Sequence, residues 1–204
     1  MRSIETLKNS DIILAEDTRH AKKLLKHYNI LTKVNSYHLN NEHKRVDEYV
    51  QMIINGNKVS LITDAGTPCI SDPGFLLIRE AIKNNILITC LTGPTAFVPA
   101  LVMSGLPSDS FIFEGFLPRK KGRKSKLYEI SQNTKTTILY ESPFRIVKTL
   151  SDMKEAIGSD RKIAIVREIS KIYEEVFRGT IEEAILEYNE RTIKGEFVIC
   201  IDKA

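Results

Sequence analysis

Short apolar runs alternate with amphipathic helical segments along almost the whole of this sequence. Ile12–Ala15 and Val59–Thr63 are typical of the apolar runs, and Asn41–Asn55 is typical of the helical segments, with Gly56 placed to end it. Alternation of this kind predicts an α/β fold, because parallel strands need long crossover connections and these are usually helices. We therefore expect mostly parallel sheets with helices on both faces.

The other predicted elements follow the same alternation. We expect further strands at Val34–Tyr37, Ile86–Leu91, Phe111–Phe113, Thr137–Tyr140, Ile163–Val166, Glu175–Arg178 and Glu196–Ile201. We expect further helices at Thr18–His27, Pro73–Asn84, Thr95–Ser104, Lys126–Gln132, Phe144–Ile157 and Ile181–Tyr188. The run Gly105-Leu106-Pro107-Ser108 interrupts the pattern, so we predict two α/β domains, residues 1–107 and 108–204.

Composition excludes several classes of protein. The 204 residues are 42% hydrophobic and 27% charged, which is typical of a globular chain and not of a disordered or fibrous one. Cys69, Cys90 and Cys200 lie far apart without a CxxC pair, which argues against a disulfide framework and against a cysteine metal site. No apolar stretch is as long as a membrane span and the first nine residues are too polar for a signal peptide. We expect a cytoplasmic protein that binds neither a membrane nor a metal.

Positive charge is concentrated in one segment of the chain. Between Pro118 and Leu127 there are six Lys or Arg residues and no Asp or Glu, whereas the net charge of the whole chain is only +4. The six residues are Arg119, Lys120, Lys121, Arg123, Lys124 and Lys126. Phe116 and Tyr128 flank the segment, where their rings could stack on bases. The segment predicts an RNA-binding loop; the alternative is a solvated charged loop.

Polar, glycine-rich turns directly follow several predicted strands. These turns are residues 16–20, 64–74, 92–95 and 141–143. In open α/β sheets ligands bind outside the carboxyl ends of the strands, so we expect a small molecule to bind at these turns. The longest turn is stiffened by Pro68 and Pro73, and it does not match the GxGxxG pattern of dinucleotide-binding folds. For each turn alone, the alternative is an ordinary connection between a strand and a helix.

Taken together, these motifs resemble one family. The turns above, with Ser104–Pro107, Phe113–Gly122, Tyr140–Arg145 and Gly195–Val198, are similar to those of the ribosomal RNA small-subunit methyltransferase I group of the tetrapyrrole methylase superfamily. The most discriminating stretch is Gly-Phe-Leu-Pro-Arg-Lys-Lys-Gly at 115–122. Relatives that methylate corrin rings or diphthine lack this combination, and they usually carry Gly-Asp-Pro where this chain has Asp-Ala-Gly-Thr-Pro.

The resemblance implies a fold, a cofactor and a substrate. It implies two α/β domains with S-adenosylmethionine in the cleft between them, and a homodimer. The implied reaction is 2′-O-methylation of a cytidine in the decoding region of 16S ribosomal RNA, with that RNA or the small ribosomal subunit as partner. The implied cofactor-binding residues are Asp64, Ala65, Gly66, Ile70, Ser71, Asp72, Gly74, Gly93, Pro94 and Ala96.

The sequence departs from the family pattern in three places. The pattern has a strand and a Thr-Pro-Ile-Gly-Asn loop ahead of the helix that here begins at Met1, and this sequence lacks both. Cys69 stands where glycine is usual, and Phe144 stands where histidine is usual.

Methyl transfer to a ribose hydroxyl depends mainly on alignment of the reacting atoms. Orientation supplies about 7–11 kcal/mol of a barrier, whereas a general base contributes about 10²–10⁴-fold. We expect the reactive chemistry at Asp17, Arg19, His20 and Glu141, with His38 as a further candidate for the proton acceptor. Each candidate has a structural alternative. Asp17 fits a helix N-cap, the histidines fit hydrogen-bonded structural residues, and Glu141 fits a partner of Arg145.

Two other functions are compatible with the same sequence. A small-molecule, tetrapyrrole-type methyltransferase would share the fold but would have no use for the basic loop. A non-catalytic RNA-binding remnant is the second alternative, because the first strand of the family pattern is missing. Binding of S-adenosylmethionine separates the remnant from the enzymes, and the choice between small ribosomal subunits and a free tetrapyrrole as methyl acceptor separates the two enzymes.

Overall fold

The computed structural model describes all 204 residues and divides into two compact units, Met1–Pro94 and Thr95–Ala204. Both units are of the α/β type that the alternation predicts. The division falls at Pro94, earlier than the predicted boundary at Pro107. The reason is that helix α5 (Phe97–Ser104) packs on the second sheet, where Ala100 and Leu101 share a buried cluster with Val198.

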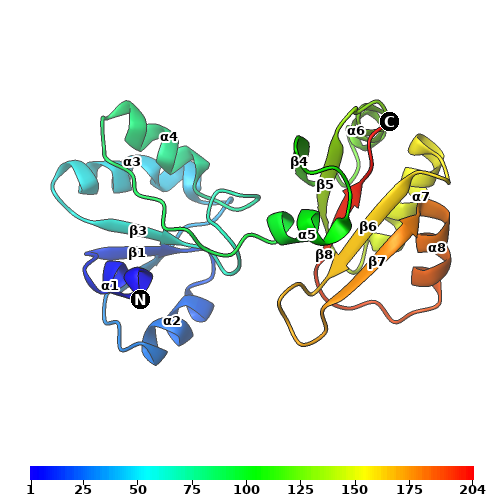
Figure 1. The fold of residues 1–204 in the computed structure, drawn as a ribbon. Coiled ribbons are helices and arrows are strands. Elements are labelled where there is room, and N and C mark those ends of the chain that lie inside the picture. The colour runs from blue at the N-terminus through cyan, green and yellow to red at the C-terminus, as the bar shows by residue number, and fades with distance from the viewer. The chain divides into compact units, whose positions relative to one another are not determined.

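The first unit is a three-stranded parallel sheet between two pairs of helices (Figure 1). Its strands are β1 (Ile12–Ala15), β2 (Lys33–Ser36) and β3 (Val59–Ile62), in the order β2-β1-β3. Its helices are α1 (Arg2–Lys8), α2 (Thr18–His27), α3 (Glu42–Ile54) and α4 (Phe75–Lys83).

The central strand β1 is buried along its whole length and alternates between the two faces. Ile13 packs with Leu7 of α1 and Leu25 of α2. Its neighbours Ile12 and Leu14 belong to the cluster on the opposite face, which α3 and α4 cover. This alternation holds the carboxyl end of β1 at a fixed height between the helix layers, and α2 starts from that end.

The predicted strand Ile86–Leu91 was wrong. The segment forms no ladder with another strand, and Leu87 in its middle is 92% exposed. Its apolar, β-branched sequence has the propensity for a strand, but a strand exists only through hydrogen bonds to a neighbour. Ile86 alone packs against the α3–α4 side of the sheet.

The second unit is a five-stranded sheet in the order β4-β5-β8-β6-β7. Its strands are β4 (Phe111–Phe116), β5 (Thr136–Glu141), β6 (Lys162–Arg167), β7 (Glu175–Thr180) and β8 (Phe197–Ile201). Strands β4 and β5 are parallel, and the other three pairings are antiparallel, so this sheet is mixed, unlike the parallel sheet of the first unit.

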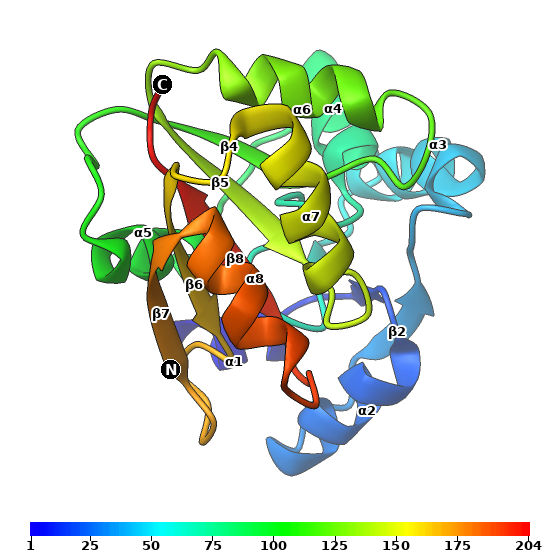
Figure 2. The ribbon, with the colours of Figure 1, turned by 90° about the vertical axis from the view of Figure 1, so that its right-hand side faces the viewer.

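Helices cover both faces of the second sheet. One face packs against α6 (Arg123–Ser131), α7 (Ile146–Ile157) and α8 (Ile181–Asn189), and α5 packs against the other. Figure 2 shows α7 and α8 lying across the first of these faces. Helix α6 begins at Arg123, so the second half of the basic segment is helical and not part of a loop. No helix is both long and apolar enough to cross a membrane.

Candidate functional site

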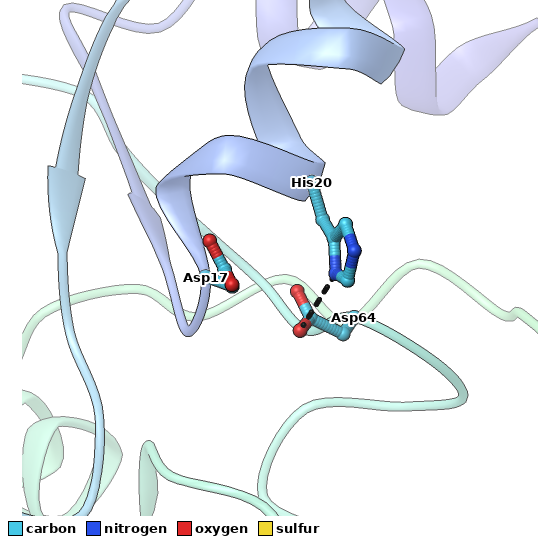
Figure 3. A group of neighbouring side chains, drawn as sticks. All are labelled: Asp17, His20 and Asp64. Carbon is cyan, nitrogen blue, oxygen red and sulfur yellow. Dashed lines mark hydrogen bonds and ion pairs between the residues drawn. The ribbon is translucent and has the colours of Figure 1, made fainter.

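Asp17, His20 and Asp64 come together at the carboxyl end of the first sheet (Figure 3). Strands β1 and β3 are adjacent and parallel, so the residues that follow them emerge side by side. His20 lies in the first turn of α2, and its Nδ1 is 3.3 Å from Oδ2 of Asp64. The two side chains are 64% and 36% exposed. A carboxylate at one ring nitrogen orients an imidazole and leaves the other nitrogen free to accept a proton.

Asp17 and Arg19, in contrast, are occupied with each other. Oδ1 of Asp17 accepts a hydrogen bond from the backbone N–H of Arg19 at 2.8 Å, which makes Asp17 the N-cap of α2. The Arg19 guanidinium also donates to Oδ1 and Oδ2, at 3.0 and 2.6 Å. These hydrogen bonds hold the pKa of the Asp17 carboxyl well below its usual range. Such a carboxylate is a weak proton acceptor at neutral pH, and its oxygens are already taken, so we assign no metal to the cluster.

Two more carboxylates lie beside this cluster. Oγ1 of Thr63 is 2.7 Å from Oδ2 of Asp72 and 3.3 Å from Oε2 of Glu16. Partial burial raises the pKa of both carboxyl groups, and neighbouring carboxylates raise both further. Negative charge is therefore concentrated at this end of the sheet, which suits a cationic ligand.

The loop Asp64–Gly74 has an unusual and well-determined backbone. Gly66, Cys69, Ser71 and Gly74 all have left-handed φ, at 78°, 72°, 64° and 130°. At Gly74 an added Cβ would lie 2.5 Å from Cδ2 of Leu61, so only glycine fits there. These positions close the loop over the end of β3 in one conformation.

Glu42 anchors the end of this loop, and the sequence analysis missed it. Its Oε2 accepts a hydrogen bond from the N–H of Gly74 at 3.2 Å, and the residue is only 7% exposed. Glu42 lies in the first turn of α3. A carboxylate in the first turn of a helix is common, because it complements the helix dipole, so the sequence carried no specific signal for this role.

The second predicted cofactor turn lies against this loop. Oγ1 of Thr67 donates to the carbonyl oxygen of Pro94 at 3.0 Å, and that oxygen is 3.9 Å from where a Cβ of Gly66 would be. Gly93 and Pro94 thus lie beside Gly66 within the first unit. The predicted cofactor residues that are exposed are Asp64, Ala65, Gly66, Ile70, Ser71, Gly93 and Pro94.

The other three predicted cofactor residues differ from these. Asp72 is half-buried beside Thr63. Gly74 is buried, so it shapes the loop from beneath instead of touching a ligand. Ala96 lies in the second unit, directly before α5.

His38 and Glu141 are not available as proton acceptors. His38 is partly buried, with Nε2 3.3 Å from Nδ2 of Asn41 and with Nδ1 also buried. Glu141 ends β5 in the second unit and is 2% exposed. Its Oε2 accepts from Oγ1 of Thr149 at 2.6 Å, its Oε1 accepts from the N–H of Ser142 at 2.7 Å, and Nε of Arg145 is 3.3 Å from Oε1. The structure thus gives Glu141 a structural role in place of the predicted catalytic one.

Arg123 also has a structural role, which corrects the prediction that it contacts RNA. It is 7% exposed and donates to Oδ2 of Asp152 at 2.6 Å, to Oγ1 of Thr149 at 2.8 Å and to the carbonyl oxygen of Pro118 at 3.2 Å. Nη2 of Arg145 donates to the neighbouring carbonyl oxygen of Leu117 at 2.9 Å. Two arginines therefore fix the start of the basic segment to the network around Glu141.

Four of the six predicted RNA contacts remain free. Lys126 is paired with Glu114 at 3.2 Å and with Glu129 at 2.7 Å. The exposed residues without an ion pair are Arg119, Lys120, Lys121 and Lys124. Phe116 and Tyr128 are 53% and 65% exposed. The segment consequently offers four cations with exposed aromatic rings at its flanks, although two of its charges are used internally.

Comparison with known proteins identifies the family. Residues 1–185 match the family described as Tetrapyrrole (Corrin/Porphyrin) Methylases. The chain belongs to the tetrapyrrole methylase family. This confirms the resemblance seen in the sequence and its α/β fold class. Within the family the chain is similar to several proteins named ribosomal RNA small subunit methyltransferase I.

The similarity to these relatives covers almost all of this tetrapyrrole methylase. Identity is 46% over 202 residues with the protein of Halalkalibacterium halodurans, 43% over 201 residues with that of Synechocystis, and 39% over 201 residues with that of Thermotoga maritima. Each match spans 98% of this chain, and 70%, 72% and 90% of the respective relatives.

Solved structures of other tetrapyrrole methylases have the same fold. The methyltransferase CobJ matches with a TM-score of 0.71 at 15% identity, over 100% of this chain and 87% of that chain. Uroporphyrin-III-C-methyltransferase from Thermus thermophilus matches with a TM-score of 0.61 at 16% identity, over 100% and 87%. At these identities the likeness concerns the fold alone.

Proposed function

We propose that this chain uses S-adenosylmethionine to methylate ribosomal RNA of the small ribosomal subunit. The observation that carries the proposal is the 39–46% identity, over 98% of the chain, with proteins named for that reaction. We further propose that the acceptor is the ribose 2′-oxygen of a cytidine in the decoding region of 16S ribosomal RNA. The enzyme would act in the cytoplasm, as a homodimer with the cofactor in a cleft between its domains.

The first unit has the chemistry that S-adenosylmethionine requires. This cofactor supplies an electrophilic methyl group on a positively charged sulfonium sulfur. The carboxylates of Glu16, Asp64 and Asp72 give the end of the sheet a negative field that complements the positive charge. The exposed backbone at 64–66 and 93–94 offers N–H and C=O groups in one fixed geometry, which is how small-molecule sites obtain orientation.

His20 is the residue that we assign as proton acceptor. Asp64 accepts the Nδ1–H, which leaves Nε2 as a free base on an exposed side chain. As the ribose oxygen forms its bond to the methyl carbon, the hydroxyl proton passes to Nε2 of His20. Asp17, His38 and Glu141 are weaker candidates, because their oxygens or nitrogens are paired or buried.

The basic segment of the second unit supports RNA as the substrate rather than a free tetrapyrrole. Arg119, Lys120, Lys121 and Lys124 are exposed and unpaired, and a small planar ligand has no use for them. Four phosphate contacts predict a slope of about −3 to −4 for log K against log salt, since each contact contributes about −0.7 to −0.9. The changes Lys120→Glu and Lys121→Glu should together weaken RNA binding while binding of S-adenosylmethionine is unchanged.

A methyl-transfer assay tests the proposal directly. The protein is incubated with S-adenosylmethionine labelled with tritium in the methyl group, and with either small ribosomal subunits or a free tetrapyrrole. We expect label in the 16S RNA and, after digestion to nucleosides, 2′-O-methylcytidine by mass spectrometry. Label in the tetrapyrrole alone would overturn the RNA assignment. Label in the RNA on a base would overturn the 2′-O assignment while leaving the RNA substrate in place.

A further inference from the structure

The first unit carries a second basic surface, on α2 and the start of β2. Five Lys or Arg residues and no Asp or Glu lie between Thr18 and Lys33, whereas the rest of this unit has seven Lys or Arg and ten Asp or Glu. Arg19 is used by Asp17. The remaining four are exposed and form no ion pair: Lys22, Lys23, Lys26 and Lys33. An unpaired positive cluster on an otherwise acidic unit needs an explanation of its own.

Three of these lysines surround a hollow in the surface. Lys22, Lys26 and Lys33 line a depression of about 480 Å³, together with Leu25, Ile30 and Val34 on its apolar side. Exposed apolar and aromatic groups lie next to it, with Leu31 98% and Tyr28 39% exposed. Cations around an apolar floor with an aromatic ring beside it match a nucleic acid strand, which offers phosphates and stacking surfaces at once.

Neither helix stability nor a lipid surface accounts for this arrangement as well. The helix dipole favours positive charge in the last turn of α2, which explains Lys26 and His27 but not Lys22 or Lys33. Binding in a bilayer requires a free apolar helix face, and the apolar face of α2 is already buried, with Leu25 3% exposed. The outward face of the helix is left with its charges.

We propose that the hollow lined by Lys22, Lys26 and Lys33 binds the sugar-phosphate backbone of the RNA substrate, next to the nucleotide that is methylated. This inference rests on the proposed function, because His20 begins the same helix. α2 has ten residues, so its first and last turns are separated by about 15 Å. A strand whose reactive ribose lies at His20 therefore has its flanking nucleotides within reach of these lysines. The surface belongs to the first unit and acts separately from the basic segment at 119–124.

The test replaces the three lysines by glutamine, which keeps most of each aliphatic stem and removes the charge. We compare Lys22→Gln/Lys26→Gln/Lys33→Gln with the matched control Lys8→Gln/Lys44→Gln/Lys58→Gln, which removes three exposed, unpaired charges elsewhere in the same unit. Binding to small ribosomal subunits is measured from 0.05 to 0.3 M salt. We expect the slope of log K against log salt to become less steep by about 2–2.7 in the first variant, which is on the order of 100-fold weaker binding at 0.15 M salt. The control should keep the wild-type slope.

The outcomes separate this inference from the proposed function. If the wild-type protein transfers no methyl group to ribosomal RNA, the proposed function fails whatever the lysines do. If it transfers the group and the two triple variants bind subunits equally well, the proposal for the hollow is refuted. Loss of binding to vesicles containing phosphatidylserine, with RNA binding unchanged, would also refute it by assigning the surface to a membrane. Binding of S-adenosylmethionine, followed by calorimetry, should be the same in all three proteins and reports that the first unit is folded.

Discussion

The buried network in the second unit makes a sharp prediction about Thr149. This residue has no exposed surface, and its hydroxyl both donates to Oε2 of Glu141 at 2.6 Å and accepts from Nη2 of Arg123 at 2.8 Å. Thr149→Val keeps the shape and removes the hydroxyl. Each charged partner then loses one hydrogen bond in a site that water does not reach, and such bonds contribute about 1.5–3 kcal/mol each.

The partners keep some of their other contacts, which limits the expected loss. Glu141 retains Ser142 and Arg145, and Arg123 retains Asp152. We therefore expect Thr149→Val to lower the free energy of unfolding of the second unit by about 2–4 kcal/mol. Thr149→Ser keeps the hydroxyl and removes one methyl group, so it should cost only about 1 kcal/mol.

Hydrogen exchange followed by mass spectrometry measures this difference with an internal control. Peptides from β5 and α7 should lose protection in Thr149→Val far more than in Thr149→Ser. Peptides from the first unit should exchange as in the wild type. If the valine variant is as stable as the serine variant, the hydroxyl does not connect two buried charges and the account of Glu141 as a structural residue is refuted.

Three further predictions concern the first unit. His20→Gln should lower the rate of methyl transfer by about 10²–10⁴-fold with the affinity for S-adenosylmethionine unchanged in calorimetry, and an unchanged rate would remove His20 as the proton acceptor. Gly74→Ala should destabilise the first unit well beyond Gly56→Ala in thermal unfolding, because both have positive φ but only Gly74 has atoms at 2.5 and 2.7 Å from the new Cβ; equal losses would show that the clash relaxes. Burial raises the folded-state pKa of Asp72 above its ordinary value of 3.8, so ionisation of Asp72 removes stability as pH rises through that pKa. Asp72→Asn should therefore unfold at a higher temperature than the wild type at pH 7, with the gain lost below pH 3.8; a difference that is constant with pH would contradict this.

Local sequence signals predicted most elements of this fold. The strand Ile12–Ala15 and the helix Thr18–His27 have the predicted bounds, because an apolar run and a capped amphipathic segment are each determined by neighbouring residues. The segment Ile86–Leu91 failed for the opposite reason, since its state depends on a partner strand that local sequence does not specify.

The candidate site was predictable in its location but not in its pairings. Strand ends indicated where Asp17, His20 and Asp64 would gather, because parallel strands bring their carboxyl ends to one edge. Which of them would pair was hidden, since His20 binds Asp64, 44 residues away, while Asp17 binds its neighbour Arg19. The same holds for Arg123, which belongs to a basic run in the sequence but reaches Asp152, 29 residues further along. Counting charges along a chain therefore overstates how many of them face a partner.

The short helix α2 has a consequence for how a substrate is chosen. It carries an imidazole at one end and lysines toward the other, and a packed helix does not stretch. An enzyme built this way measures its target with a gauge of constant length, so the distance between the backbone anchor and the modified sugar is set by the protein. Nucleotides would then be selected by the path that the folded RNA takes past this gauge, and the identity of the neighbouring bases would matter only through that path.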